Sequence, residues 1–114
     1  MSNRKNIFTL NKHTQIEISD GYMRFNMHGG SCDIKYVGSF TLKQVAEIIR
    51  DITRADNGKW FAPCEHISFG VEFDEPEEDA CVLEIIPTSV YMSFAIKESL
   101  LPALATFFFL NSDL

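Results

Sequence analysis

The sequence lacks any apolar run long enough to cross a membrane. Its longest candidate, residues 107–110, falls far short of the roughly 18–20 residues that a spanning helix needs. Two basic residues, Arg4 and Lys5, stand near the N-terminus, but no apolar stretch of signal-peptide length follows them. We therefore expect a cytoplasmic protein.

Cysteine is also scarce. The three cysteines, Cys32, Cys64 and Cys81, are odd in number and form no CxxC pair. This pattern disfavours a disulfide framework and is typical of reduced thiols.

Recognisable catalytic and metal-binding motifs are missing as well. There is no GxSxG, HExxH or GxGxxG motif, and the carboxylates at 75–79 do not have EF-hand spacing. Cys64 and His66 would point the same way in an extended segment, so a thiolate–imidazole pair is conceivable, but chance co-occurrence is the simpler explanation. We predict that the protein is not an enzyme, with no catalytic residues, no metal and no cofactor.

The chain does contain ample material for one hydrophobic core. It has 114 residues, of which 46% are apolar, with ten Phe. This length suits one domain, and the composition is too apolar for a disordered chain. We expect a single domain over residues 1–114, with pseudo-halves at 1–57 and 58–114.

Alternating residues in the first half predict a three-stranded meander. Asp20-Gly21 is a type I′ hairpin signal that would align Ile16 with Phe25 and Glu17 with Arg24, an opposite-charge pair. A second turn at Gly29-Gly30 would align Phe25 with Ile34 and keep the same buried face. Residues 7–10 could add an edge strand.

A helix should follow this meander. Thr41 and Gln44 fit a capping box, and Leu42, Val45, Ile48, Ile49 and Ile52 recur at helical spacing. Asn57-Gly58 is expected to end the helix.

The second half is predicted to repeat the same order of elements. A linker at 57–66 would lead to strands at 67–73, 81–86 and 90–96, and then to a helix that Ser99 caps and whose first turn holds Pro102. The predicted fold is therefore α+β: two antiparallel β-meanders, each followed by a helix, in the order β-β-β-α twice.

Charge is distributed unevenly along the chain. Residues 1–57 hold eight basic and six acidic side chains (net +2), and residues 58–114 hold two basic and ten acidic (net −8), which sum to −6. Between 65 and 84 there are eight carboxylates and no Lys or Arg. One interpretation is a solubilising loop; the other is a docking surface for a basic protein, because complementary charge speeds association. Under the second interpretation the partner-binding residues are Glu72, Asp74, Glu75, Glu77, Glu78 and Asp79, with Trp60 or Phe61 as an aromatic anchor.

The sequence resembles two groups of known proteins, the first in the order of its predicted strands and helices. The repeated meander–helix unit, at residues 15–53 and 67–110, is similar to the duplicated arrangement of Whirly-type single-strand-binding proteins. Their basic nucleic-acid motif has no match here, and the net charge of −6 opposes a phosphate backbone, so we expect no nucleic-acid partner.

The acidic stretch at 72–79, together with Trp60-Phe61, also resembles the small cytosolic immunity proteins of bacterial toxin–immunity systems, including contact-dependent growth inhibition. That resemblance implies a protein that neutralises a cognate toxin, such as a nuclease with a positive substrate cleft. The alternatives are a phage-type inhibitor that mimics nucleic acid and a homodimeric ligand-binding or regulatory domain.

Overall fold

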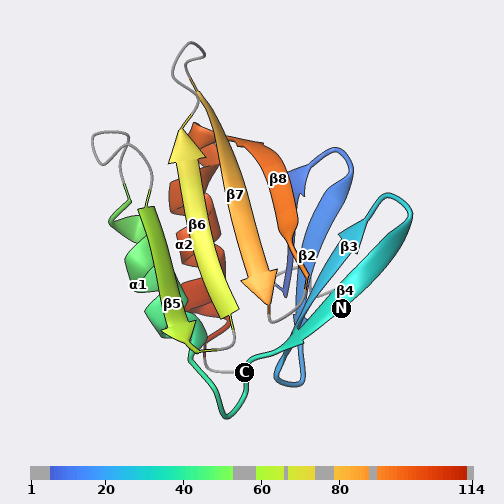
Figure 1. Ribbon diagram of the computed structural model, residues 1–114, viewed down its shortest axis with the longest axis vertical. Coiled ribbons are helices and arrows are strands. Elements are labelled where there is room, and N and C mark those ends of the chain that lie inside the picture. Colours follow the sequence, from blue (N-terminus) through green and yellow to red (C-terminus); the bar gives the residue numbers. More distant parts are fainter. Residues whose placement is uncertain (1–5, 53–58, 66, 74–78, 88–89, 113–114) are drawn as a thin grey trace.

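Two four-stranded antiparallel sheets and two helices make up the fold (Figure 1). The computed structural model describes residues 6–52, 59–65, 67–73, 79–87 and 90–112, without the side chains of residues 59–61. The first sheet has the order β1 (Ile7–Asn11), β2 (Thr14–Ser19), β3 (Tyr22–Met27), β4 (Gly30–Lys35). The second has the order β5 (Lys59–Cys64), β6 (Ile67–Phe73), β7 (Ala80–Pro87), β8 (Met92–Lys97).

This architecture confirms the α+β class but corrects the expected plan of three strands per helix. Each helix follows four strands. The added strand in the first sheet is β1, which pairs with β2 as expected for residues 7–10. The added strand in the second sheet is β5, which occupies most of the segment that was predicted to be a linker.

The first hairpin has the predicted register, with Ile16 opposite Phe25 and Glu17 opposite Arg24. Asp20 (φ 49°) and Gly21 (φ 83°) both take the positive φ values of a type I′ turn. A Cβ at residue 21 would come within 2.8 Å of Cγ1 of Val37, so glycine is required there for space as well as for backbone conformation.

The second hairpin differs from its predicted register by two residues. Met27 pairs with Gly30 and Phe25 with Cys32, so His28 and Gly29 are the central turn residues. Gly29 supplies the positive φ, at 95°. Because side chains alternate with period two, the shift leaves the buried face unchanged: Met23, Phe25 and Ile34 are buried as predicted.

Helix α1 (Leu42–Arg50) begins with the predicted capping box. The Gln44 amide donates to the Thr41 hydroxyl (3.1 Å), and the Thr41 amide donates to the Gln44 side chain (2.8 Å). The helix ends at Arg50, with Asp51 as C-cap, well before the expected stop at Asn57-Gly58, which lies outside the described residues.

A short 3-10 helix, η3 (Glu98–Leu100), leads into helix α2 (Leu101–Leu110), and Pro102 lies in the first turn of α2 as predicted. Ser99 is not the cap of this helix. It lies inside η3, and Leu100 precedes α2 without a side-chain cap.

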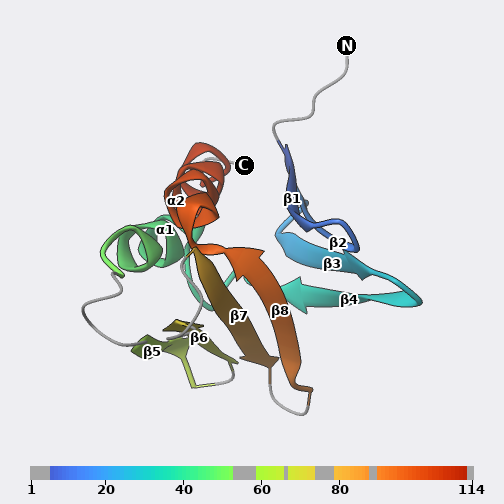
Figure 2. The same ribbon diagram turned by 90° about the horizontal axis from the view of Figure 1, so that it is seen from above.

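The two helices lie side by side over one face of the second sheet, and the first sheet stands beside them, next to β8 (Figures 1 and 2). Aromatic pairs join these parts. Phe25 of β3 stacks on Phe94 of β8, with ring centroids 5.5 Å apart, and Phe8 of β1 contacts Phe107 of α2 at 5.3 Å. One core of buried residues therefore includes both halves of the chain. No helix among the described residues has the length and apolar character needed to span a membrane.

Candidate protein-binding surfaces

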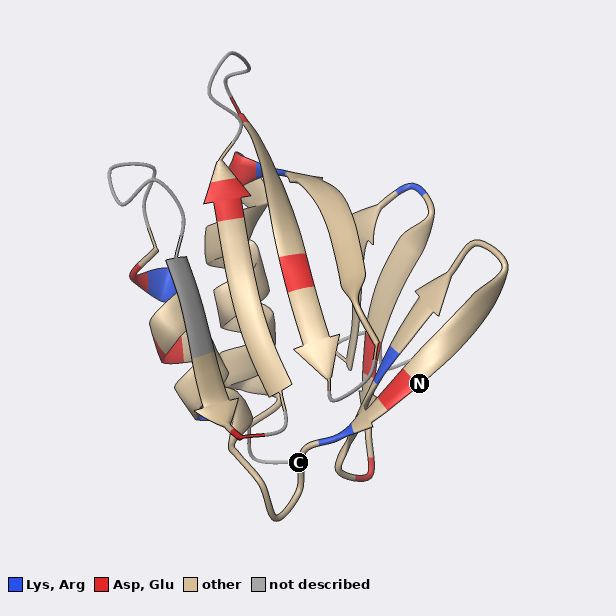
Figure 3. Ribbon diagram, in the orientation of Figure 1, with Lys and Arg blue, Asp and Glu red and all other residues tan. Residues whose placement is uncertain are grey.

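Two of the acidic residues predicted to bind a partner, Glu72 and Asp79, lie at the same end of the second sheet. Glu72 is exposed near the end of β6, and Asp79 lies immediately before β7. Figure 3 shows acidic positions in red at the tip of β6 and beside the start of β7. The other four predicted carboxylates, Asp74, Glu75, Glu77 and Glu78, lie outside the described residues, in the connection between these strands.

Asp79 has a structural role that its sequence context did not indicate. Its Oδ1 accepts the Ser99 amide hydrogen at 2.8 Å, and its backbone carbonyl accepts the Glu98 amide hydrogen at 3.1 Å. Its φ of 60° places it in the left-handed region, which Asp tolerates better than most residues. Asp79 thus ties the start of β7 to the turn between β8 and α2. Ser99 was expected to act as a cap with its own side chain, but here the Asp79 carboxylate accepts the backbone amide hydrogen of Ser99.

Trp60 and Phe61, the predicted aromatic anchor, lie in edge strand β5. Trp60 is aligned with Gly70 of β6 and Phe61 with Phe69. Gly70, the residue opposite Trp60, is two residues from Glu72 along β6, or about 7 Å at the rise of a strand. The side chains of Trp60 and Phe61 lie outside the described part of the chain.

Glu84, the last carboxylate of the acidic run, is buried. Only 7% of it is exposed, and the Tyr91 hydroxyl donates a hydrogen bond to its Oε2. This hydrogen bond is the main cause of a raised pKa for Tyr91, with burial and the negative charges of Glu84 and Glu72 adding to it. The Glu84 Oε1 atom is buried without a hydrogen-bond partner among the described residues. Glu84 therefore cannot contribute to a solvated docking surface as the sequence count suggested.

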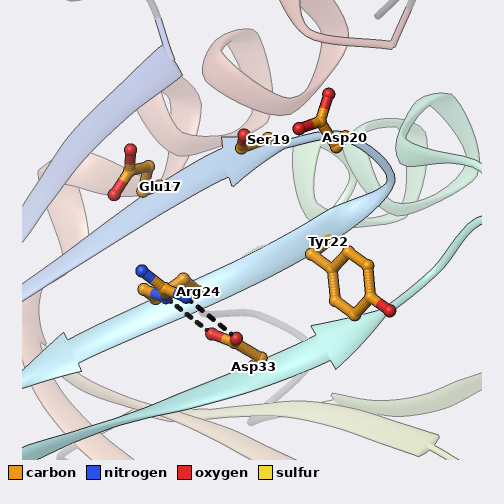
Figure 4. A pocket seen from close by; sticks show the side chains of 6 residues that line it. All are labelled: Glu17, Ser19, Asp20, Tyr22, Arg24 and Asp33. Atoms are coloured by element: carbon orange, nitrogen blue, oxygen red, sulfur yellow. Dashed lines mark hydrogen bonds and ion pairs between the residues drawn. The ribbon is translucent and has the colours of Figure 1, made fainter.

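A second candidate surface is a hollow of about 320 Å³ on the outer face of the first sheet (Figure 4). Six residues line it: Glu17, Ser19, Asp20, Tyr22, Arg24 and Asp33. The sequence analysis aligned Glu17 with Arg24 and placed Asp20 in the turn between their strands, but it did not single out Ser19 or Tyr22. The predicted hairpin register, which aligns Ser19 with Tyr22, could have placed these beside the others.

Charge in this hollow is partly neutralised. Arg24 forms two hydrogen bonds with Asp33, at 2.7 Å from Nε and 3.1 Å from Nη2. The hydrogen bond from Arg24 is the main cause of a lowered pKa for Asp33, and the same pair raises the pKa of Arg24. The sequence predicted that Arg24 would pair with Glu17. The alignment of these two residues is correct, but the ion pair forms with Asp33 on the neighbouring strand.

The described residues offer little support for a thiol–imidazole site. Cys64 ends β5 and is partly buried, whereas His66 lies outside the described residues, so their pairing stays a hypothesis. Across the described ranges, no three or more His, Cys, Asp or Glu side chains gather as they would around a metal ion.

Comparison with known proteins adds no relative to this picture. No family model matches the chain, and neither a curated protein nor a solved structure shows significant similarity to it.

Proposed function

We propose that this protein is an immunity-type inhibitor that acts in the cytoplasm and neutralises a basic toxin, most simply a nuclease. The observation that carries the proposal is the acidic run of the sequence, eight carboxylates and no Lys or Arg between residues 65 and 84, of which Glu72 lies near the end of β6 and Asp79 immediately before β7.

The charge argument is physical. Carboxylates held close together repel one another, so such a cluster is unfavourable for the isolated protein unless a cation binds to it. A nuclease must bind a polyanion, and its substrate cleft is therefore positive. An acidic hairpin would be attracted to that cleft or to the surface beside it, and association would be faster than between neutral surfaces.

The residues have different roles in this proposal. Glu72, Asp74, Glu75, Glu77 and Glu78 would attract and pair with basic side chains. Asp79 would hold the base of the hairpin, because its carboxylate already accepts a hydrogen bond from Ser99. Trp60 or Phe61 of β5 would supply the apolar contact, because aromatic residues dominate the binding energy of many interfaces.

The test is charge reversal on the hairpin with a matched control. A Glu75→Lys/Glu77→Lys/Glu78→Lys variant changes the formal net charge from −6 to 0, since each replacement adds two. A Glu17→Lys/Glu47→Lys/Asp51→Lys variant makes the same change on the first sheet and α1. Each is co-expressed with the toxin domain encoded by the neighbouring reading frame, and association rates are measured at low and high salt.

We expect the hairpin variant to associate at least tenfold more slowly than the wild type and to lose protection, while the control keeps both. The wild-type rate should fall steeply as salt rises. Equal slowing by both variants would mean that net charge alone matters. Slower association of the control variant alone would indicate that the interface lies on the first sheet and α1.

Failure of any neighbouring gene product to bind would overturn the immunity proposal. Self-association of the purified chain, measured by analytical ultracentrifugation, would then favour a homodimeric regulatory or ligand-binding domain. A phage gene neighbourhood would favour an inhibitor that mimics nucleic acid.

A further inference from the structure

Two histidines far apart in the sequence come together where the two sheets meet. The rings of His13 and His28 have centroids 5.7 Å apart and planes inclined at 66°. With Met27 they line a hollow of about 290 Å³ that also includes Ser93 and Phe94 of β8. Neither the acidic surface nor the proposed toxin partner accounts for this grouping.

The hairpin register fixes the pairing of the histidines. Gln15 is opposite Asn26, and the same register continued by two residues places His13 opposite His28. Both residues lie in turns just outside the strands, which begin at Thr14 and end at Met27. The turn at His13 is held by its amide hydrogen bond to the Asn11 side chain, at 2.8 Å.

We propose that His13, His28 and Met27 form a binding site for a soft monovalent metal ion, copper(I). Two imidazoles bound to one ion at about 2 Å per nitrogen have ring centres about 5.2–5.5 Å apart for angles between tetrahedral and trigonal. The observed separation of 5.7 Å exceeds this range by only a few tenths of an ångström. Both rings are exposed, so small rotations can direct a nitrogen of each toward a common point.

The ligand types select the metal. No carboxylate lines this hollow, so it offers little to calcium or magnesium, which require oxygen ligands. A thioether is a soft ligand, and imidazole and thioether together favour copper(I). Met27 is partly buried against the core, which limits its motion, and it lines the hollow together with buried Phe94.

The experiment is a titration of reduced protein with copper(I) under anaerobic conditions. The methyl groups of the four methionines and the rings of the three histidines are followed by NMR. We expect one equivalent to shift the signals of Met27, His13 and His28 together and to leave those of buried Met23 and Met92 in place. Absence of this joint shift would overturn the proposal.

Variants test the ligands one by one, with affinity measured by competition against a chromophoric copper(I) chelator. Met27→Leu conserves volume and should weaken binding at least tenfold without loss of fold, and His28→Ala should do the same. His66→Ala, the matched control, should have no effect. A Cys32→Ser/Cys64→Ser protein should also bind normally. If it loses copper(I) while Met27→Leu retains it, thiols hold the metal and the proposal is wrong.

Discussion

The two sheets have the same strand number and meander order, but they organise charge in opposite ways. On the first sheet, the outer face carries Arg24 and Asp33 as a two-bond ion pair, with side chains about half exposed. On the second, the acidic residues have no Lys or Arg near them in the chain between 65 and 84. A surface whose charges pair with one another attracts an oppositely charged partner less strongly, which is why we propose partner binding at the second sheet.

The comparison also shows that a count of carboxylates overstates the available charge. Of the eight in the acidic run, Glu84 is buried under a hydrogen bond from Tyr91, and Asp79 accepts hydrogen bonds from the β8–α2 turn. These two serve the fold. The proposed function depends on a smaller set of five: Glu72, Asp74, Glu75, Glu77 and Glu78.

The largest effect is expected from breaking the contact that joins the two sheets. Phe94 is 5% exposed and stacks on Phe25, so Phe94→Ala should lower the free energy of unfolding by about 3–5 kcal/mol through the cavity it leaves. Urea denaturation followed by circular dichroism measures this. Phe109→Ala, at a residue 53% exposed, should change stability by less than about 0.5 kcal/mol. Equal losses from both would show that the sheets are not coupled through this stack.

An intermediate effect is expected at the base of the acidic hairpin. Asp79→Ala removes the acceptor for the Ser99 amide and should cost about 1 kcal/mol, as the loss of a helix cap does. Asp79→Asn keeps an acceptor oxygen and should cost less. Glu72→Gln, at the exposed end of β6, should be nearly neutral in the same urea measurement. If Asp79→Ala were as mild as Glu72→Gln, Asp79 would belong with the docking residues instead.

The smallest effect concerns the ion pair on the first sheet. Because the pKa of Asp33 is lowered in the folded state, the pair stabilises the fold above the ordinary aspartate pKa of about 3.9, and this contribution is lost as pH falls through the lowered value. The carboxyl carbon of Asp33, followed by NMR, should titrate at higher pH in Arg24→Gln than in the wild type. High salt should reduce the difference, since both side chains are exposed. Identical midpoints would mean that the pair does not form in solution.

Local signals were sufficient for many elements. Asp20-Gly21 specified the first hairpin to the residue, and Thr41 with Gln44 specified the start of α1, because both depend on atoms within a few residues. The second hairpin was misjudged because Gly29 and Gly30 can both occupy a turn. In the structure Gly30 pairs with Met27, so Gly29 lies in the turn and Gly30 begins β4. The register differs from the prediction by two residues, and the same side chains therefore still face the core.

Strand β5 was missed for a different reason. Its sequence contains Pro63 and follows Asn57-Gly58, both of which suggest a loop, and it pairs only with β6, at the edge of the second sheet. Such a strand is stabilised by its neighbour more than by its own propensity. The role of Asp79 was missed because its hydrogen-bond partner, Ser99, is twenty residues away in the sequence.

By itself, the sequence determined the α+β class, the buried face of each meander, the cap of α1 and the concentration of acid in the second half, because these follow from periodicity and composition. Only the tertiary structure decided that Arg24 pairs with Asp33, that Glu84 is buried under Tyr91, and that the rings of His13 and His28 lie 5.7 Å apart. These contacts depend on how strands and turns meet in space, and no local propensity encodes that arrangement.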